Sequence, residues 1–222
     1  MIFFTISLNQ LIEAKSGTDK KKRRIVQQQL VVNKFLTPWY QLAKNRIKKY
    51  LENVSDASIL TKAVEDIKKG REDTPKYKNI KRVSLEAISK VREMKFENIL
   101  VGNYEVIKPH DKTLEFQNIR ITVSPDVVFR YIEDGVRKVG AVKFHVSKTN
   151  PFDLQQCKAI GNLLKYYLLD KVVEKDDIVD ERLCWAYDVF GERLVHADKD
   201  VSMTKTEVIS LCNELEGIYN SL

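Results

Sequence analysis

One hairpin signal constrains the fold more than any other part of the sequence. Two runs of branched and aromatic residues, 127–132 and 136–147, lie on either side of an Asp134-Gly135 pair. Because Asp-Gly accepts the positive φ angles of a two-residue turn, this pattern predicts an antiparallel hairpin. The hairpin brings Asp126, at the start of the first strand, face to face with Lys143 on the second. A lysine inside such an apolar strand is costly without an anionic partner, and Asp126 is a candidate for that partner.

The apolar patterns around this hairpin predict an α+β (α/β-like) fold. The first 98 residues have mostly helical spacing, after a short apolar strand at the start. From about residue 99 the pattern changes to alternation and turn signals. Further strands are expected at 104–107, 114–123, 183–189 and 193–197, and helices at 154–172 and 204–222. We therefore expect a basic helical lobe at 1–98, followed by a domain at 99–222 in which helices flank a mixed sheet.

Positive charge is concentrated in the first of these domains. Residues 1–98 contain 22 basic and 11 acidic side chains, whereas residues 99–222 contain 16 and 20. A basic lobe beside a mildly acidic domain is typical of proteins that bind phosphates, although lysine-rich, solvated helix faces would have the same composition. The candidate phosphate contacts are Lys20, Lys21, Lys22, Arg23, Arg24, Lys44, Arg46 and Lys48. Trp39 and Tyr40 either stack on bases or belong to the core.

The sequence argues against several other classes of protein. Cys157, Cys184 and Cys212 have no metal-ligand spacing, so we expect reduced, buried cysteines rather than a zinc site. No apolar run reaches the roughly 20 residues of a membrane-spanning helix, and the start lacks the flanks of a signal peptide. We therefore expect a cytoplasmic protein with no membrane partner. The sequence has no Walker loop, dinucleotide fingerprint or nucleophile elbow.

The Pro125-Asp126 pair, the hairpin, Lys143 and the helix that follows together resemble the PD-(D/E)xK nuclease superfamily, which has the restriction-endonuclease-like fold. The resemblance covers about residues 99–200 and includes the order strand, strand, helix, strand. It implies that Asp126 binds Mg²⁺ or Mn²⁺ and that Lys143 orients the attacking water or stabilises the developing phosphorane. Gln155 or Gln156, at the start of the next helix, would contact nucleic acid.

One position departs from the family pattern. Ala141 stands where the family has an acidic metal ligand, and two carboxylates commonly anchor a divalent cation in such sites. An acid from elsewhere could replace it, and the sequence does not choose among the candidates Glu105, Glu115, Asp153, Glu93 and Glu97. His145 shares the strand face of Lys143, so it either contacts phosphate or is packed as an ordinary core histidine.

Three functions remain open at this point. The first is a nucleic-acid-binding protein with a nuclease-like domain that acts on DNA rather than RNA, by metal-assisted hydrolysis of a phosphodiester. The second is a catalytically inactive module of the same fold, which serves DNA binding or assembly, and Ala141 favours it. The third is a scaffold whose basic lobe binds an acidic protein surface. A homo-oligomer or another protein partner is compatible with each of them.

Overall fold

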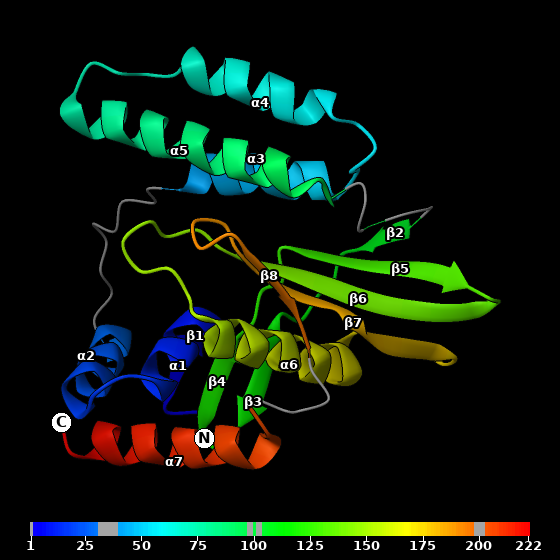
Figure 1. Cartoon of the computed structure of the whole chain (residues 1–222). Coiled ribbons are helices and arrows are strands. Elements are labelled where there is room, and N and C mark those ends of the chain that lie inside the picture. Colours follow the sequence, from blue (N-terminus) through cyan, green and yellow to red (C-terminus); the bar gives the residue numbers. More distant parts are fainter. Residues whose placement is uncertain (1, 31–39, 97–99, 101–103, 198–202) are drawn as a thin grey trace.

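A five-stranded mixed sheet forms the centre of the molecule (Figure 1). The computed structural model describes all residues except 1, 31–39, 97–99, 101–103 and 198–202. The strand order of this sheet is β2-β5-β6-β7-β8. Its strands are β2 (Tyr104–Ile107), β5 (Val127–Glu133), β6 (Val136–His145), β7 (Asp177–Asp188) and β8 (Arg193–His196).

The predicted hairpin is confirmed as β5 and β6. The two strands pair antiparallel from Val127↔Val142 to Glu133↔Val136. Asp134 and Gly135 both have positive φ angles, 52° and 77°, as a two-residue turn with the correct twist requires. The hairpin therefore forms where the Asp-Gly signal placed it.

The helix after the hairpin connects two parallel strands. Asp153 caps the N-terminus of α6 (Leu154–Lys171), and Gln156 completes a capping box with it. The chain then returns along β7, which runs parallel to β6. A helical crossover is the usual way to join parallel neighbours in a sheet, and the order strand, strand, helix, strand is the predicted one.

A second, three-stranded sheet has the order β1-β4-β3. It consists of β1 (Phe4–Ser7), β3 (Thr113–Phe116) and β4 (Ile119–Thr122). The run expected as strand at 114–123 is thus a tight hairpin, which turns at Gln117 with a φ of 55°. β1 confirms the predicted strand at the start of the chain and pairs parallel with β4.

The beginning of the chain packs with its end, which differs from the predicted lobe at 1–98. β1, α1 (Leu8–Lys15) and α2 (Asp19–Leu30) share one hydrophobic cluster with β4, α6 and α7 (Lys205–Asn220). Ile6 and Leu11 are fully buried there, against partners such as Leu211. These apolar side chains need a partner surface, and β4 and α7 provide it. A boundary at residue 98 therefore does not separate two packed units.

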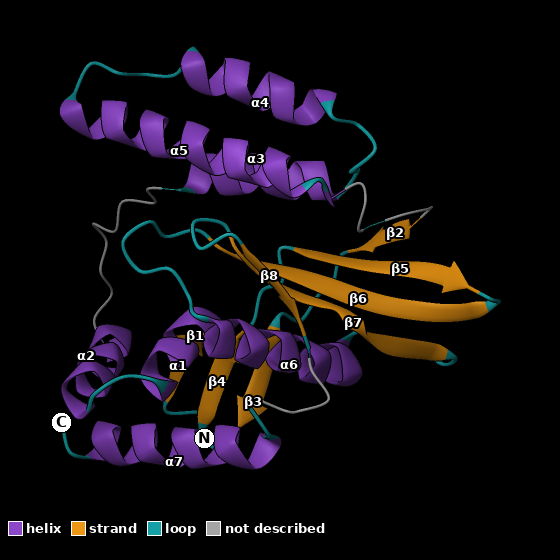
Figure 2. Cartoon of the chain, viewed as in Figure 1, coloured by secondary structure: helices purple, strands orange, loops and turns teal. Residues whose placement is uncertain are grey.

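The other helices of the predicted lobe form a separate layer. α3 (Gln41–Leu51), α4 (Ser58–Lys68) and α5 (Pro75–Met94) contact one another and cover the opposite face of the five-stranded sheet (Figure 2). Alternation along β6 divides the two cores: Ala141 faces the α6 side, whereas Val142 and Phe144 face α3, α4 and α5.

The described residues confirm an α+β fold in which helices flank a mixed sheet. Cys157, Cys184 and Cys212 are buried, as expected. In the part of the chain that the structure describes, no helix combines the length and apolar character of a membrane span.

Candidate nucleic-acid interface

Asp126 and Lys143 meet at the open end of the β5–β6 hairpin. Val127↔Val142 is the last pair of the ladder, and the Asp126 N–H still donates to the Val142 carbonyl at 2.8 Å. The Asp126 carboxylate turns back and accepts the Phe144 N–H at 2.7 Å. Asp126 therefore lies one residue beyond the ladder, next to Lys143 in the register, as the sequence predicted. No ion pair joins the two side chains among the described contacts, so Asp126 is not the anionic partner that was expected for Lys143.

Lys143 is held by a strained segment of backbone. Its ammonium donates to the Ser124 carbonyl at 2.6 Å. Ser124 has a φ of 41°, although it is not glycine and precedes Pro125, two conditions that disfavour this conformation. The Lys112 carbonyl holds the segment by accepting the Val123 and Ser124 N–H groups at 2.9 and 3.1 Å. Strain of this kind concentrates at functional sites.

The charges of several other lysines act on the Lys143 ammonium. Burial lowers the pKa of this ammonium, and the charges of Lys44, Lys112 and Lys48 lower this pKa further, while Asp126 opposes them. Lys44 and Lys48 are one helical turn apart on α3, so they repel each other as well. Positive charge is thus concentrated at this end of the hairpin.

A small cavity of about 130 Å³ adjoins Asp126. Lys48, Lys108 and Lys112 line it together with Glu52 and Asp126. We call Lys44, Lys48, Lys108, Lys112 and Lys143 the lysine cluster. Three parts of the chain supply it: α3, the segment between β2 and β3, and β6. A polyanion laid across this end of the hairpin would meet several ammonium groups at once.

The residues of this site do not fit a divalent cation. Ala141 is fully buried between Val128 and Cys184, within the apolar core on the α6 side, and supplies no oxygen. Asp126 has one carboxylate oxygen occupied by a backbone N–H, and although Glu52 adds a second carboxylate to the cavity, three lysines line it as well. Mg²⁺ prefers several convergent oxygen ligands, which this arrangement does not offer. No group of three or more His, Cys, Asp or Glu side chains with metal-ligand geometry occurs among the described residues.

The acids considered as replacements for the missing ligand lie elsewhere. Glu105 pairs with Arg130 on the β2–β5 ladder, four residues along β5 from Asp126. Glu115 forms an ion pair with Arg120 in the other sheet, Asp153 caps α6, and Glu93 accepts a hydrogen bond from Ser89 on α5. Glu97 lies outside the described residues.

Three residues of the site were not singled out from the sequence. Glu52, Lys108 and Lys112 reach the cavity only because the end of α3 and the β2–β3 segment meet at the start of β5. Lys108 and Lys112 flank the turn residues Pro109 and Asp111, a weak local signal for a basic loop. Nothing in the local sequence links Glu52 to Asp126.

His145 has a structural role in the described contacts. Its side chain is buried, stacks on Phe152 with ring centroids 3.6 Å apart, and contacts Asn9 and the Asn150 carbonyl. Burial lowers the pKa of this imidazole, so it stays neutral. The predicted phosphate contact of His145 therefore has no support in the geometry.

Gln156 is also engaged structurally. It caps α6 through Asp153 and donates to the Ser16 hydroxyl at 3.0 Å. Gln155 is exposed on the first turn of the same helix. Of the two predicted glutamines, only Gln155 thus presents an exposed side chain.

The basic run at the start of α2 lies apart from the lysine cluster. α2 packs on α1, β1 and α7, whereas α3 packs on α4 and α5 on the other side of the sheet (Figure 1). Lys21 and Lys22 form ion pairs with Glu13 and Glu214, and Arg23 donates to Ser221. Lys20 and Arg24 are exposed. The structure does not bring this run together with Asp126.

The remaining residues that were predicted to contact nucleic acid are Arg46, Tyr40 and Trp39. Arg46 pairs with Asp66 of α4 at 2.9 Å, which ties it to the helical layer. Tyr40 contacts Phe190, with ring centroids 5.7 Å apart, and its hydroxyl accepts the Lys148 N–H. Trp39 lies outside the described residues.

The sequence matches no protein-family model and no curated protein. The resemblance to the PD-(D/E)xK nucleases therefore rests on the residues described above.

Proposed function

We propose that this protein binds nucleic acid through the lysine cluster, as a nuclease-like module in which phosphate binding outweighs metal chemistry. The observation that carries the proposal is the cavity beside Asp126, which Lys48, Lys108 and Lys112 line together. Within the described residues, Lys44, Lys48 and Lys112 form no ion pair with a carboxylate. Repulsion among the lysines that line this cavity falls when a phosphate binds between them.

The chemistry of phosphates suits this site better than that of an acidic protein surface. A phosphodiester backbone presents closely spaced, identical charges, and each ammonium that neutralises one releases a condensed counterion. The lysines come from a helix, a loop and a strand, so they form a fixed array rather than a flexible tail. Duplex DNA, our first choice over RNA, is the probe for this array.

The test is the affinity for a 20-base-pair DNA duplex across a series of salt concentrations. Replacing Lys48 and Lys112 by alanine should weaken binding and reduce the slope of log K against log [salt] by about 2, since each lost phosphate contact removes about 0.9. The matched control replaces Lys20 and Arg24 of α2 by alanine and should leave the slope unchanged. Absence of binding at low salt, or an equal effect of both variants, would contradict the proposal and favour the scaffold.

A second candidate function is hydrolysis of the bound phosphodiester. Asp126 opposite Lys143 at the end of a hairpin is the arrangement that the nuclease resemblance implies. The resemblance predicts Mg²⁺ or Mn²⁺ as the cofactor, but the oxygen ligands at the site do not fit a divalent cation. The same DNA, and an RNA of the same sequence, are incubated with each metal ion beside the Asp126→Asn and Lys143→Ala variants. Cleavage that both variants abolish would establish this function. Absence of cleavage would exclude hydrolysis and favour a module that only binds nucleic acid.

A further inference from the structure

A second cavity, distinct from the lysine site, lies farther along the same strand. Its volume is about 270 Å³, and three aromatic rings line it: Tyr104 of β2 with Phe129 and Tyr131 of β5. Leu100, Leu183, Glu133 and Arg182 complete the lining. Phe129 is three residues from Asp126, so about 10 Å of strand separates the two sites.

The rings that line this cavity are fixed by their neighbours. Tyr104 and Phe129 meet edge to face, with centroids 5.8 Å apart. The Tyr104 hydroxyl donates to the Leu51 carbonyl at 2.9 Å, and the Tyr131 hydroxyl donates to Asp180 at 2.8 Å. Since both hydroxyls are engaged in the fold, a ligand in the cavity would meet ring surfaces that lose little conformational freedom on binding.

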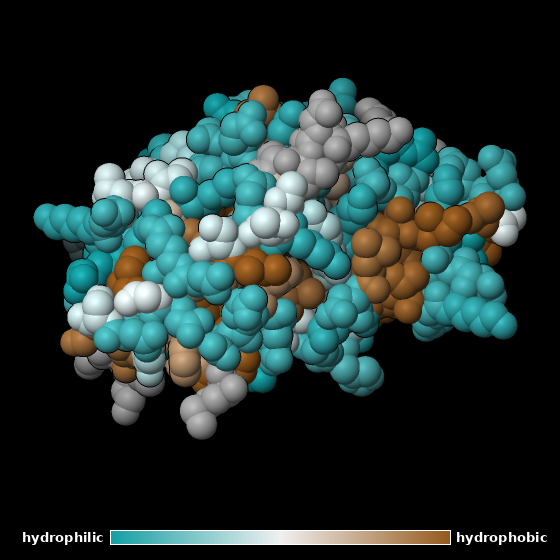
Figure 3. Space-filling model, turned by 90° about the horizontal axis from the view of Figure 1, so that it is seen from below, coloured by the Kyte–Doolittle hydropathy of each residue, from teal (hydrophilic) through white to brown (hydrophobic). Residues whose placement is uncertain are grey.

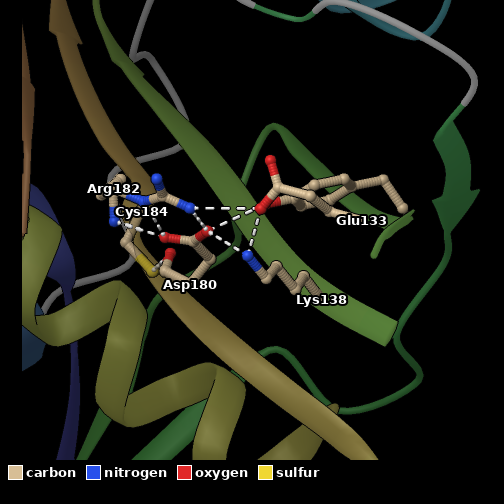
Figure 4. A network of polar contacts seen from close by, with 6 residues as sticks. Glu133, Lys138, Asp180, Arg182 and Cys184 are labelled. Atoms are coloured by element: carbon tan, nitrogen blue, oxygen red, sulfur yellow. Dashed lines mark hydrogen bonds and ion pairs between the residues drawn. The ribbon is translucent and has the colours of Figure 1, made fainter. Parts of the chain in front are cut away.

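Two of the lining residues, Glu133 and Arg182, belong to a network of polar contacts (Figure 4). Asp180 accepts two hydrogen bonds from the Arg182 guanidinium, at 3.0 and 2.6 Å. Glu133 lies 3.5 Å from the same guanidinium and forms an ion pair with Lys138, which also approaches Asp180 at 3.7 Å. The network thus holds a carboxylate and a guanidinium, both partly exposed, beside the aromatic wall.

This combination selects against charged ligands. A cation in the cavity would meet Arg182, and an anion would meet Glu133. A neutral, planar ring stacks on aromatic side chains, and its amino groups find an acceptor in Glu133. The volume lies just below the roughly 300–1,000 Å³ of cavities for whole small ligands, so it suits a ring rather than a nucleotide.

We propose that this cavity takes one unpaired nucleobase of the strand whose phosphates contact the lysine cluster. The inference rests on the proposed function and adds a substrate class, single-stranded nucleic acid. A base inside a duplex is stacked on both sides, so it reaches such a cavity only after leaving the stack. The sheet projects beyond α6 at this end (Figure 1), and in the view from below an apolar area covers the α6 face of the projecting part (Figure 3), whereas Phe129 and Tyr131 of the cavity lie on the opposite face.

The test compares a 12-nucleotide single strand that carries one 2-aminopurine with the duplex of the same sequence. Tyr131→Leu removes the ring while keeping an apolar side chain, and Tyr131→Phe keeps the ring without the hydroxyl. Tyr131→Leu should weaken binding of the single strand by about 5- to 100-fold, the range for loss of a stacking ring, and should abolish the change in 2-aminopurine fluorescence. Tyr131→Phe should bind as the unsubstituted protein does. Neither variant should alter duplex binding.

A second variant fills the cavity, so that the proposal can still be tested if Tyr131→Leu does not fold. Leu183→Trp should also weaken single-strand binding and spare the duplex, with circular dichroism as the check on folding. If the single strand and the duplex bind with equal affinity, and none of the three variants changes either affinity, the base cavity is ruled out. That outcome is still compatible with phosphate binding at the lysine cluster. If no oligonucleotide binds at low salt, the proposed function fails, and this inference fails with it.

Discussion

At the scale of single residues, the candidate site is built at the expense of stability. Burial and the charges of three other lysines disfavour the charged form of Lys143. Ser124 adopts a φ of 41°, and its carbonyl accepts a hydrogen bond from the Lys143 ammonium. Residues in sparsely populated backbone regions cost of the order of 1–3 kcal/mol each. A fold under selection for stability alone would place an apolar residue at position 143.

Replacing Lys143 by methionine should therefore raise the free energy of unfolding at pH 7. The groups that act on its ammonium are Lys44, Lys48 and Lys112, which lower its pKa together with burial, and Asp126, which raises it. Below the lowered pKa the native state holds the proton unfavourably. As the pH rises from that value towards the unfolded pKa of about 10.4, the unfolded state binds more protons, so the native protein gains stability.

The advantage of Lys143→Met should accordingly shrink between pH 7 and pH 10. Urea unfolding of both proteins at several pH values measures this difference. Lys138→Met provides the control, since the Lys138 ammonium is paired with Glu133. An advantage that stays constant with pH would mean that packing, rather than charge, distinguishes the two side chains.

The sequence predicts only part of the site, for a physical reason. Asp126 and Lys143 are joined by a local hairpin, whose turn residues set the register, so their meeting follows from alternation. Glu52, Lys108 and Lys112 arrive by tertiary packing of α3 and the β2–β3 segment. Local periodicity carries no information about such contacts.

At the scale of elements, turns and caps decide which patterns could be read. The Asp134-Gly135 turn and the Asp153 cap can be predicted from the sequence because each needs particular residues at fixed positions. The β3–β4 turn at Gln117 cannot be predicted in this way, since glutamine rarely adopts a φ of 55°. β7 also begins earlier than expected, at Asp177, whose carboxylate pairs with Arg130 and Arg137.

Among the glycines that the structure describes, two have open space around them, and they distinguish the effect of backbone strain from that of packing. Gly135 has a φ of 77°, Gly217 lies in α7, and a Cβ at either position would meet no atom within 4 Å. Gly135→Ala should destabilise the protein by about 1 kcal/mol, because alanine is strained in the left-handed region. Gly217→Ala should stabilise it by about 0.5–1 kcal/mol through helix propensity. Chemical denaturation of both variants checks the opposite signs, and equal signs would contradict the turn geometry.

At the scale of the whole molecule, local patterns do not indicate that the first thirty residues belong to the C-terminal core. Helical spacing and high positive charge linked them to the following helices instead. Their partners, β4 and α7, lie more than a hundred residues away, and parallel pairing leaves no turn signature. The predicted lobe thus combined two units with similar composition and different neighbours.

Ile6→Ala should therefore destabilise the whole fold. Ile6 is fully buried in β1, and its truncation leaves a cavity beneath α7 and β4, with an expected loss of about 2–5 kcal/mol. Ile132→Ala is the control, since Ile132 is 69% exposed and its truncation should change stability by less than about 0.5 kcal/mol. Thermal unfolding distinguishes the two variants, and a negligible effect of Ile6→Ala would mean that β1 is peripheral.

The pairing of β1 with β4 also has a consequence for synthesis on the ribosome. Residues 4–7 leave the exit tunnel long before residues 119–122, and the cluster that buries them also needs Leu211 and Leu215. Contacts so distant in sequence slow folding, because a long loop must close before they form. Until residue 215 has emerged, the nascent chain therefore exposes this apolar strand, and we expect chaperones to bind it during that interval.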